Sequence, residues 1–332
     1  MLRQAKLALF AVADAIGVNK LILESSWRKQ RLLVLCYHGV SIEDEHEWNP
    51  ELYIPAELLR QRLEELKRLR MNVLPLGEAI ERLKAGTLPA RSAAITFDDG
   101  NYDFYKVSWP VLSEFNFPVT VYYTTYYAEY NRPVFTVGLS YLAWKGKAAS
   151  TPNLDEIMAK GLDAGQKDDL LRNFSAELRI DYDAFCAKRL LQIMTLAEAA
   201  ELAKQGVDFQ LHTHRHRVSK NREKFLKEID DNRTRLGQVT ATKEATHFCY
   251  PGGYYRAEFP GWLAGHGVVS ATTCNAGIAG PESQMHLLPR FIDTMYAPPV
   301  EFRSWLSGLA ALLPHRAHVM SDGQLMEEWE KE

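Results

Sequence analysis

Two adjacent carboxylates, Asp98 and Asp99, directly follow an apolar run at residues 93–97. As neighbours in the chain, their side chains diverge and can serve different purposes. Adjacent carboxylates repel each other, and a metal ion bound by one of them lowers the cost of holding both charges. The second carboxylate would then be free to accept a proton. The tripeptide Asp-Asp-Gly is also typical of a solvated turn, so both interpretations stay open at this point.

Three histidines lie close together in the sequence at His212, His214 and His216. In one turn of helix, His212 and His216 would lie on the same side, at a spacing suited to two imidazole ligands of one metal ion. In an extended segment, all three would share a face instead. Two histidines and one carboxylate leave coordination positions open, as a catalytic metal requires. A cluster of surface histidines without a ligand is the alternative.

A short turn, Tyr250-Pro251-Gly252-Gly253, could bind an oxyanion. The backbone N–H groups of its glycines are not hindered by a Cβ atom, and such donors stabilise a negatively charged oxygen. A plain turn is the other interpretation of the same four residues.

These three polar segments follow predicted strands, and the strands alternate with predicted helices. Short apolar runs indicate buried strands, and apolar residues spaced by three or four indicate helices. The alternation predicts a parallel α/β sheet or barrel, in which the carboxyl ends of the strands form one rim where active sites are built. The strands are predicted at residues 32–36, 72–76, 93–97, 119–123, 207–211, 247–250, 268–273 and 286–292, and the helices at 55–69, 77–84, 107–115, 195–205 and 219–236.

The alternation is interrupted between residues 128 and 194, which we interpret as a partly helical insertion with helices near 167–180 and 183–194. Tyrosines gather where the chain enters it, and their rings could stack on sugar rings or pack in the core. These tyrosines are Tyr122, Tyr123, Tyr126, Tyr127 and Tyr130. The predicted organisation is an N-terminal amphipathic segment at residues 1–31, a barrel at 32–296 and a C-terminal helical extension at 297–332.

Composition and charge narrow the class of protein. The 332 residues are 46% hydrophobic and 24% charged, which is typical of a globular protein with a sizeable core. A net charge of -3 provides no overall attraction to nucleic acid, so we expect no such partner. The four cysteines form no Cys-x-x-Cys pair, which argues against zinc-finger and thioredoxin-like sites and fits free thiols in a reducing compartment. We therefore expect a cytoplasmic location.

Residues 1–20 have a basic start and an apolar middle that Asp14 interrupts. The apolar run is shorter than the ~20 residues of a spanning helix, and no convincing signal-peptide cleavage site follows it. We predict an amphipathic helix, which could rest on an anionic membrane surface or pack on the domain. The apolar stretch at residues 302–313 is followed by His315-Arg316 and so resembles residues 1–20 in character. It could add a second contact with the membrane. The protein could then lie at the inner face of the membrane.

Taken together, the polar segments resemble the motifs of the polysaccharide deacetylase family, the NodB-homology carbohydrate esterases. Thr96-Phe97-Asp98-Asp99-Gly100 matches the first motif, His212-Thr213-x-x-His216 the second, and Phe248-x-Tyr250-Pro251-x-Gly253 a variant of the third. The matches follow the family's motif order and cover about residues 32–127 and 195–295. The resemblance implies a distorted (β/α) barrel and hydrolysis of an N-acetyl group on an amino sugar, in a polysaccharide or a lipid-linked glycan.

The resemblance also implies a role for each matching residue. Asp98 would be the general base. Asp99, His212 and His216 would hold a divalent metal ion, usually zinc. The N–H group of Gly252 would help to bind the oxyanion. Contact with the substrate would come from the rest of the turn: Tyr250, Pro251 and Gly253.

Two positions depart from the family pattern. Cys249 stands where many members have an arginine that orients the base, and Leu288-Pro289-Arg290 stands where a late motif usually supplies a histidine acid. Arg290 could replace the missing arginine from another strand, as a catalytic residue, or form a structural salt bridge. The acid therefore stays unassigned. The candidates are His214 and His286, while His38 at the end of the first strand either points to the same rim or caps a loop.

These departures leave alternatives to the removal of an N-acetyl group. One is a barrel that binds carbohydrate but has lost or impaired turnover, and this protein would bind metal and glycan without releasing acetate. The other is a deformylase or another amidase that uses the same metal site.

Overall fold

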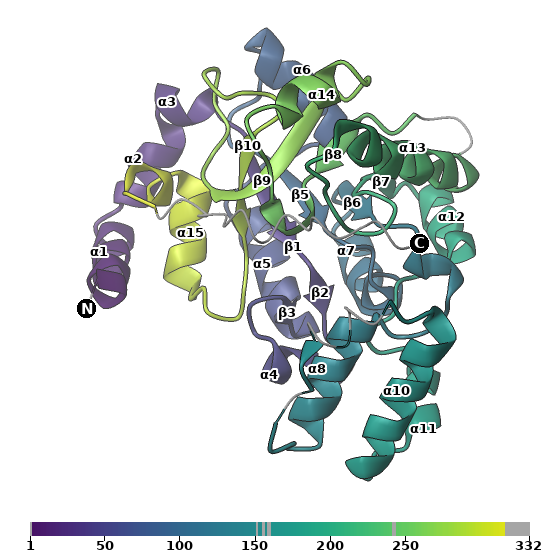
Figure 1. Ribbon diagram of the computed structural model, residues 1–332. Coiled ribbons are helices and arrows are strands. Elements are labelled where there is room, and N and C mark those ends of the chain that lie inside the picture. Colours follow the sequence, from purple (N-terminus) through teal and green to yellow (C-terminus); the bar gives the residue numbers. More distant parts are fainter. Residues whose placement is uncertain (1, 151, 155–156, 158–160, 241–243, 316–332) are drawn as a thin grey trace.

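Seven parallel strands form a closed barrel in the computed structural model, which describes residues 2–150, 152–154, 157, 161–240 and 244–315 (Figure 1). The barrel closes because β1 pairs with both β10 and β5, and Leu35, for example, pairs with Phe291 and with Ile95. This arrangement confirms the predicted α/β fold, a distorted (β/α) barrel. The strands around it are β1 (Leu33–Tyr37), β10 (Leu288–Ile292), β9 (Ser270–Ala276), β8 (His247–Cys249), β7 (Asp208–Leu211), β6 (Val119–Tyr123) and β5 (Ser92–Phe97).

The barrel is distorted because some of its pairings are short or irregular. The register between β9 and β10 shifts between Leu288 and Arg290. A further short strand, β4 (Asn72–Val73), pairs with the beginning of β5. The loop after β1 contributes to a separate two-stranded sheet of β2 (Gly39–Val40) and β3 (Tyr53–Ile54).

One end of the barrel is closed by an amphipathic helix, α6 (Leu76–Ala85). Its apolar face packs in one cluster with inward-facing strand residues such as Val34 and Tyr122. Gly77 of α6 lies against the ring of His247, the first residue of β8, and a Cβ atom on Gly77 would be 3.1 Å from Nε2 of that ring. Because His247 is the first residue of its strand and all strands of the barrel run in the same direction, α6 closes the amino end of the barrel. The carboxyl rim remains to form a site.

Helices on the outside cover the other faces of the strands, which is why the strands are buried on both sides. The sequence signal at the start of one of them is confirmed: Thr195 and Glu198 form a capping box, each side chain accepting a hydrogen bond from the other residue's N–H group. The helix predicted at 107–115 begins earlier, with a π-helical turn at Phe104–Ser108. The outer helices are α5 (Ala56–Arg68), α7 (Trp109–Ser113), α12 (Leu196–Lys204), α13 (Arg222–Val239) and α14 (Phe259–Ala264), and α4 (Glu45–Trp48) lies in the loop before β3.

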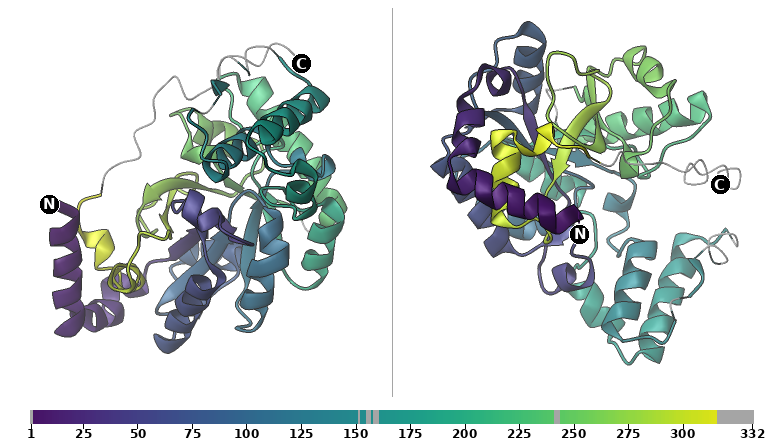
Figure 2. Two further views of the ribbon diagram at one scale, coloured as in Figure 1. Left: turned by 90° about the horizontal axis from the view of Figure 1, so that it is seen from below. Right: turned by 90° about the vertical axis from the view of Figure 1, so that its left-hand side faces the viewer.

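The predicted insertion leaves the barrel after β6 and extends away from it (Figures 1 and 2). Its described elements are the 3-10 turn η2 (Tyr127–Glu129) and the helices α8 (Phe135–Lys145), α10 (Ala164–Glu177) and α11 (Tyr182–Ala187). The helices share a small apolar core. The helix predicted at 183–194 is wrong beyond Ala187. Arg189 and Leu191 have φ angles of 56° and 59°, which an α-helix cannot contain.

Helices from the two ends of the described chain pack against each other beside the barrel (Figure 2). Asp14 accepts a 2.7 Å bond from Arg303 across this contact. Among the described residues, no helix is both long and apolar enough to cross a membrane. Residues 316–332 of the predicted extension lie outside the described part, and the domain boundaries stay a prediction. The helices are α1 (Leu2–Ala15), α2 (Val18–Glu24), α3 (Ser26–Lys29) and α15 (Pro299–Ser307), followed by the 3-10 turn η4 (Ala310–Leu312).

Candidate active site

Three side chains predicted as metal ligands converge at the carboxyl rim of the barrel. Nε2 of His212 and Nε2 of His216 each lie 3.1 Å from Oδ1 of Asp99. Asp99 follows β5 and His212 follows β7 directly, so two strand ends place them. Their ligand atoms all lie within 4.8 Å of one another, as binding to a single ion requires. We call Asp99, His212 and His216 the outer group.

The loop that carries the two histidines is neither helical nor extended. Thr213 and His216 have φ angles of 60° and 56°, so the backbone turns twice within five residues. This conformation places the rings of His212 and His216 with their centroids 4.9 Å apart. His214 points elsewhere: its Nδ1 lies 2.9 Å from Oγ1 of Thr125, and burial lowers its pKa to about 4. The spacing in the sequence thus identified the pair, but neither regular conformation that we considered produces it.

His212 is held in one orientation by hydrogen bonds on both sides. Its Nδ1–H donates to the carbonyl oxygen of Cys249 at 2.8 Å, and this bond turns Nε2 toward Asp99. Its backbone N–H donates to Oδ1 of Asn232, a fully buried residue of α13. The amide nitrogen of Asn232 in turn donates to the carbonyl of Tyr123 and to the hydroxyl of Thr125. Through these hydrogen bonds of Asn232, the outer helix α13 links the loops after β6 and β7.

Electrostatics within the outer group favour an ionised carboxylate. Burial alone would raise the pKa of Asp99, but His216 and His212 lower it well below its usual value. The pKa of His216 is raised in return, because attraction to Asp99 exceeds the opposing effect of burial. A divalent cation between these groups would take over this attraction, with neutral imidazoles as ligands.

Asp98 lies inside the barrel and forms a two-pronged ion pair with Arg290. Both terminal nitrogens of the guanidinium lie 2.7 Å from the two carboxylate oxygens, and both residues are almost completely buried. Burial raises the pKa of Asp98, but Arg290 lowers it more, so the net pKa lies well below the usual value. The carboxylate is thereby kept ionised and fixed in orientation.

Arg290 reaches this position from β10, across the space that the small side chain of Cys249 leaves. A terminal nitrogen of Arg290 lies 3.1 Å from Sγ of Cys249, and Nε donates to the carbonyl oxygen of Thr273. An arginine therefore pairs with Asp98 even though Cys249 stands in the third motif. The departure from the family pattern changes the strand that supplies the cation and leaves the ion pair in place.

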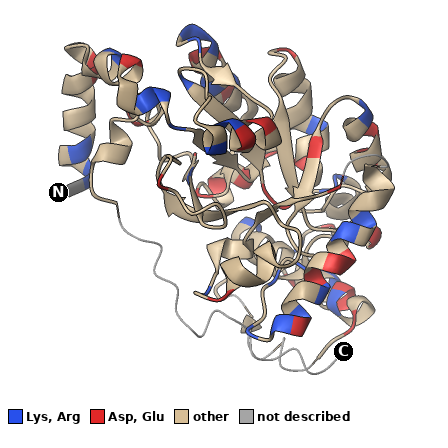
Figure 3. Cartoon of the chain, turned by 90° about the horizontal axis from the view of Figure 1, so that it is seen from above, with Lys and Arg blue, Asp and Glu red and all other residues tan. Residues whose placement is uncertain are grey.

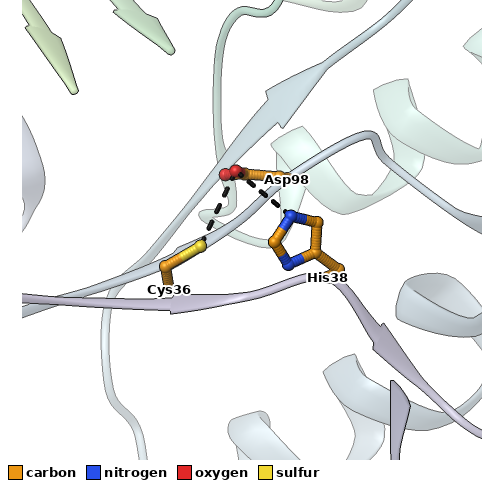
Figure 4. Close-up of side chains that lie close together, drawn as sticks. All are labelled: Cys36, His38 and Asp98. Atoms are coloured by element: carbon orange, nitrogen blue, oxygen red, sulfur yellow. Dashed lines mark hydrogen bonds and ion pairs between the residues drawn. The ribbon is translucent and has the colours of Figure 1, made fainter. Parts of the chain in front are cut away.

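His38 lies beside Asp98, and the two side chains point toward each other (Figure 4). Its Nε2 is 3.7 Å from Oδ2 of Asp98, and the thiol of Cys36 approaches the same oxygen at 3.6 Å. Nδ1 of His38 is buried and has no hydrogen-bond partner among the described residues. Burial lowers the pKa of this histidine, although the nearby carboxylates oppose the effect. We call Asp98, Arg290 and His38 the inner group.

The contact between His38 and Asp98 follows from strand pairing, which the sequence motifs do not reveal. Tyr37 of β1 is in register with Phe97 of β5, so the residues that follow them, His38 and Asp98, leave the barrel side by side. The order of strands around the barrel was the missing information. Neither His38 nor Asn232 was assigned a role from the sequence.

The glycine turn of the third motif is exposed only at its centre. Gly252 has a φ of 61° and lies at the surface, in the first turn of a 3-10 helix whose leading N–H groups have no acceptor within the helix. Gly253 has a φ of 72°, and a Cβ atom there would lie 2.7 Å from the Cβ of Cys274. Pro251 and the ring of Tyr250 are buried, and the Tyr250 hydroxyl donates to the carbonyl of His286. Their side chains shape the turn and do not reach the surface of the rim.

His286, one of the candidates for the acid, lies outside the rim. It precedes β10, whose carboxyl end forms the rim, so it lies toward the opposite end of the barrel. Its Nε2 is 2.8 Å from the carbonyl oxygen of Val268. Among the candidate histidines, His38 is therefore the one that faces Asp98.

The insertion borders the rim at both of its ends. Thr124, which follows β6, donates its N–H to the carbonyl of Asp99, and Met194, at the end of the insertion, donates to the carbonyl of Gly100. The tyrosines at its entrance divide into two sets. Tyr122 and Tyr123 are buried in the core, whereas Tyr130 is 40% exposed. The hydroxyl of Tyr130 donates to that of Tyr126, whose ring packs edge-on against His214.

Comparison with known proteins gives one family match. The model of the family described as polysaccharide deacetylase matches residues 85–269. This range contains Asp98, the whole outer group and the turn at Gly252. His38 and Arg290 lie outside it. The comparison with curated proteins gives no match.

Several solved structures share the fold. The deacetylase PplD of Streptococcus pyogenes is 19% identical, with a TM-score of 0.60, and the match covers 86% of this chain and 99% of that one. IcaB from Ammonifex degensii is 17% identical, with a TM-score of 0.56 and coverages of 83% and 97%. A de-N-acetylase from Aggregatibacter actinomycetemcomitans is 15% identical, with a TM-score of 0.57 and coverages of 83% and 99%. At these identities, the likeness concerns the fold.

Proposed function

Since the chain belongs to the polysaccharide deacetylase family, we propose that it is a metal-dependent hydrolase that removes the N-acetyl group from an amino sugar in a polysaccharide or a glycan precursor. The observation that carries this proposal is the convergence of Asp99, His212 and His216 beside a second, ionised carboxylate, Asp98. The related structures named above include a deacetylase and a de-N-acetylase, which agrees with this reaction class.

The outer group fits a divalent cation by the chemistry of its donors. Two imidazole nitrogens and one carboxylate oxygen form a set that zinc accepts and that leaves room for further ligands. The hydrogen bond from Nδ1 of His212 to the Cys249 carbonyl fixes the tautomer that such binding needs. When bound, a cation of this kind supplies a Lewis acid that polarises an amide carbonyl and makes a water molecule more acidic.

The inner group performs the proton transfers in this proposal. Asp98, kept ionised by Arg290, accepts a proton from the attacking water. His38 relays this proton from Asp98 to the departing amine, because its ring lies next to Asp98 and its Nδ1 has no partner among the described residues. Arg290 acts as a positioning residue, since its guanidinium is fully occupied by Asp98, Thr273 and Cys249.

The exposed N–H group of Gly252 is proposed to donate a hydrogen bond to the oxyanion as the acetyl carbon becomes tetrahedral. Tyr250, Pro251 and Gly253 support this turn from below, because the first two side chains are buried and Gly253 has no space for a Cβ atom. Any contact that these three residues make with the sugar would come from their backbone.

Two departures had suggested a carbohydrate-binding barrel without turnover, and the structure addresses one of them, because Arg290 supplies the cation that the third motif lacks. We also propose a cytoplasmic location. The thiols of Cys36 and Cys249 both approach Oδ2 of Asp98, at 3.6 and 3.4 Å, so their oxidation would disturb the inner group. Cell fractionation tests this location, and recovery of the protein outside the cell would contradict it.

The proposal is tested by measuring acetate and formate release from a panel of N-acylated glycans, with added zinc and with chelator. We expect acetate release that chelator abolishes and zinc restores. His214→Ala is the matched control for His212→Ala, because both residues lie in the same loop and only His212 belongs to the outer group. Glycan binding without any acyl release would favour the binding barrel, and release of formate alone would favour a deformylase.

A further inference from the structure

One side of α1 is apolar and exposed, although the opposite side is docked on the domain. Phe10 and Ala13 are buried against the rest of the molecule, and Asp14 pairs with Arg303 of α15. The other side carries Leu9 and Val12, and it is continued by Ile16, just after the end of α1, and by Leu21 of α2. We call these four residues the apolar stripe; they are 48%, 57%, 69% and 72% exposed.

The apolar stripe is a local concentration of a rare feature. Among the described residues, eleven large hydrophobic side chains are exposed, and four of them lie within the first 21 positions. The other exposed positions of α1 from residue 8 to its end are alanines. A surface helix normally presents polar residues on its outward side, so this face is the reverse of the usual pattern. Contiguous exposed apolar surface marks sites of contact with a partner or a membrane.

The charges around the apolar stripe are predominantly positive. Arg3 is exposed at the beginning of α1, where it lies 3.6 Å from Glu301 of α15, and Lys20 is exposed beside Leu21. Lys20 lines a cavity of about 500 Å³ whose other charged residues are four arginines and the two acidic residues Asp14 and Glu24. Both acidic residues of α1 and α2 are paired with arginines: Asp14 with Arg303 and Glu24 with Arg91. Figure 3 shows α1 as largely uncharged along its length, with basic residues near its beginning.

We propose that α1 and α2 dock this protein on the surface of an anionic lipid bilayer. The apolar stripe would enter the boundary between headgroups and acyl chains, while Lys20 would face lipid phosphates. A helix of 14 residues is about 21 Å long, which is too short to span the bilayer but suits a position in the plane of the interface. Peripheral helices of this type combine an apolar face with basic neighbours.

A bilayer fits this surface better than a second protein does. A stable protein interface involves roughly 20–30 residues on each side, whereas the apolar stripe has four large side chains. Basic residues beside it complement anionic headgroups. This inference does not depend on the proposed deacetylation, because binding to vesicles is measured without substrate.

The contact should be reversible and sensitive to salt. A short apolar stripe alone gives marginal binding, and stable attachment needs a second signal such as a basic cluster. The electrostatic part is screened when the Debye length shortens. We therefore expect binding at low ionic strength and release by a high-salt wash.

The test is flotation of the full chain with two kinds of vesicle, phosphatidylcholine alone and phosphatidylcholine mixed with phosphatidylglycerol. We expect binding to the anionic vesicles only. Val12→Asp combined with Ile16→Asp should weaken it at least about tenfold, because binding strength follows the apolar area buried. Val269→Asp is the matched control, since Val269 is also an exposed valine but lies before β9, outside the apolar stripe.

A second variant tests the role of charge. Lys20→Gln should weaken binding to the anionic vesicles about fivefold and flatten its dependence on salt. Circular dichroism of each variant establishes that it is folded. Failure of the wild-type chain to float with anionic vesicles would overturn the proposal. So would equal loss of binding in Val269→Asp, or a dimer that the stripe variants dissociate while vesicle binding is absent.

Discussion

The inner group and the outer group occupy the same rim but satisfy their charges in opposite ways. Asp98 faces the barrel interior, where Arg290 already neutralises it. Asp99, the next residue, turns outward at a φ of 68° and faces two imidazoles, of which His216 is 39% exposed. The charge of Asp98 is already balanced by a cation of the protein, Arg290. Asp99 instead belongs to a set of donors that suits a cation bound from solution. One dipeptide thus places two carboxylates in different surroundings because the backbone turns between its residues.

The largest effect is expected from Asp98→Asn, which keeps the shape of the inner group but removes the proton acceptor. Turnover should fall by about 10²–10⁴-fold, the usual contribution of a general base. Zinc affinity should remain close to that of the wild type, because Asp98 is not a member of the outer group. Steady-state kinetics and a metal-binding titration on the same preparation check both halves. A near-normal turnover number would remove Asp98 from the mechanism.

The outer group should show the opposite pattern. His216→Ala removes one of three converging donors, so zinc affinity should fall by at least about tenfold, since even residues that merely orient a ligand contribute 10–100-fold. Part of the lost activity should return at high zinc concentration, which would not happen for Asp98→Asn. Isothermal titration calorimetry measures the affinity. His214→Ala serves as control. An equal loss of zinc affinity in that variant would contradict the assignment of His216, and not His214, to the outer group.

Arg290→Met tests what the buried ion pair with Asp98 contributes to stability and to the pKa of Asp98. Breaking a buried pair by removing one partner costs about 3–5 kcal/mol in the free energy of unfolding. Since Arg290 lowers the pKa of Asp98 against the effect of burial, its removal should raise that pKa. The acidic limb of the pH profile of kcat/KM should then move to higher pH.

Arg62→Met is the matched control for this experiment, because Arg62 forms another buried pair, with Asp293 at 2.8 Å, outside the inner group. It should lower stability without moving the acidic limb. The difference in stability between the wild type and Arg290→Met should be full above the ordinary pKa of an aspartate. It should shrink as the pH falls below that value toward the lowered pKa of Asp98, because protonation removes the attraction. A pH profile that shifts equally in both variants would assign Arg290 a purely structural role.

The smallest effect concerns the insertion. Tyr130→Ala removes an exposed ring that contacts Tyr126 beside the rim, and the affinity for long glycans should fall by a few-fold, about 1 kcal/mol. Short glycans should be affected less. Tyr296→Ala, at another exposed tyrosine outside the insertion, is the control. Equal losses for long and short glycans would indicate that Tyr130 contributes to packing instead.

The sequence predicted the parts of this arrangement that local patterns determine. Apolar runs followed by Asp98 and by His212 indicated two strand ends, and parallel strands bring such ends to one rim. The partnership of Asp98 with Arg290 depends on the neighbours of β10 in the closed barrel, so it could only be raised as one of two options. His38 meets Asp98 because β1 pairs with β5, a contact across 60 residues that no local pattern encodes.

The histidine loop and the insertion show why the remaining details could not be predicted. Positive φ angles at Thr213 and His216 produce a turn in which a helix or an extended segment was expected. The same cause ends the second predicted helix of the insertion at Ala187, because Arg189 and Leu191 also have positive φ. Non-glycine residues adopt this conformation only when surrounding contacts compensate for it, and for His216 one of these contacts is with Asp99, which lies far away in the sequence.

The central claim is that a divalent ion held by the outer group is needed for hydrolysis of an N-acetyl amide. The most direct test is to strip the full chain of metal, titrate it with zinc, and measure acetate release and bound zinc in the same samples. The account predicts that acetate release rises in proportion to bound zinc and reaches its maximum at one equivalent, and that His212→Ala loses both together. Full acetate release from the stripped chain, or an unchanged zinc affinity in His212→Ala, would contradict it.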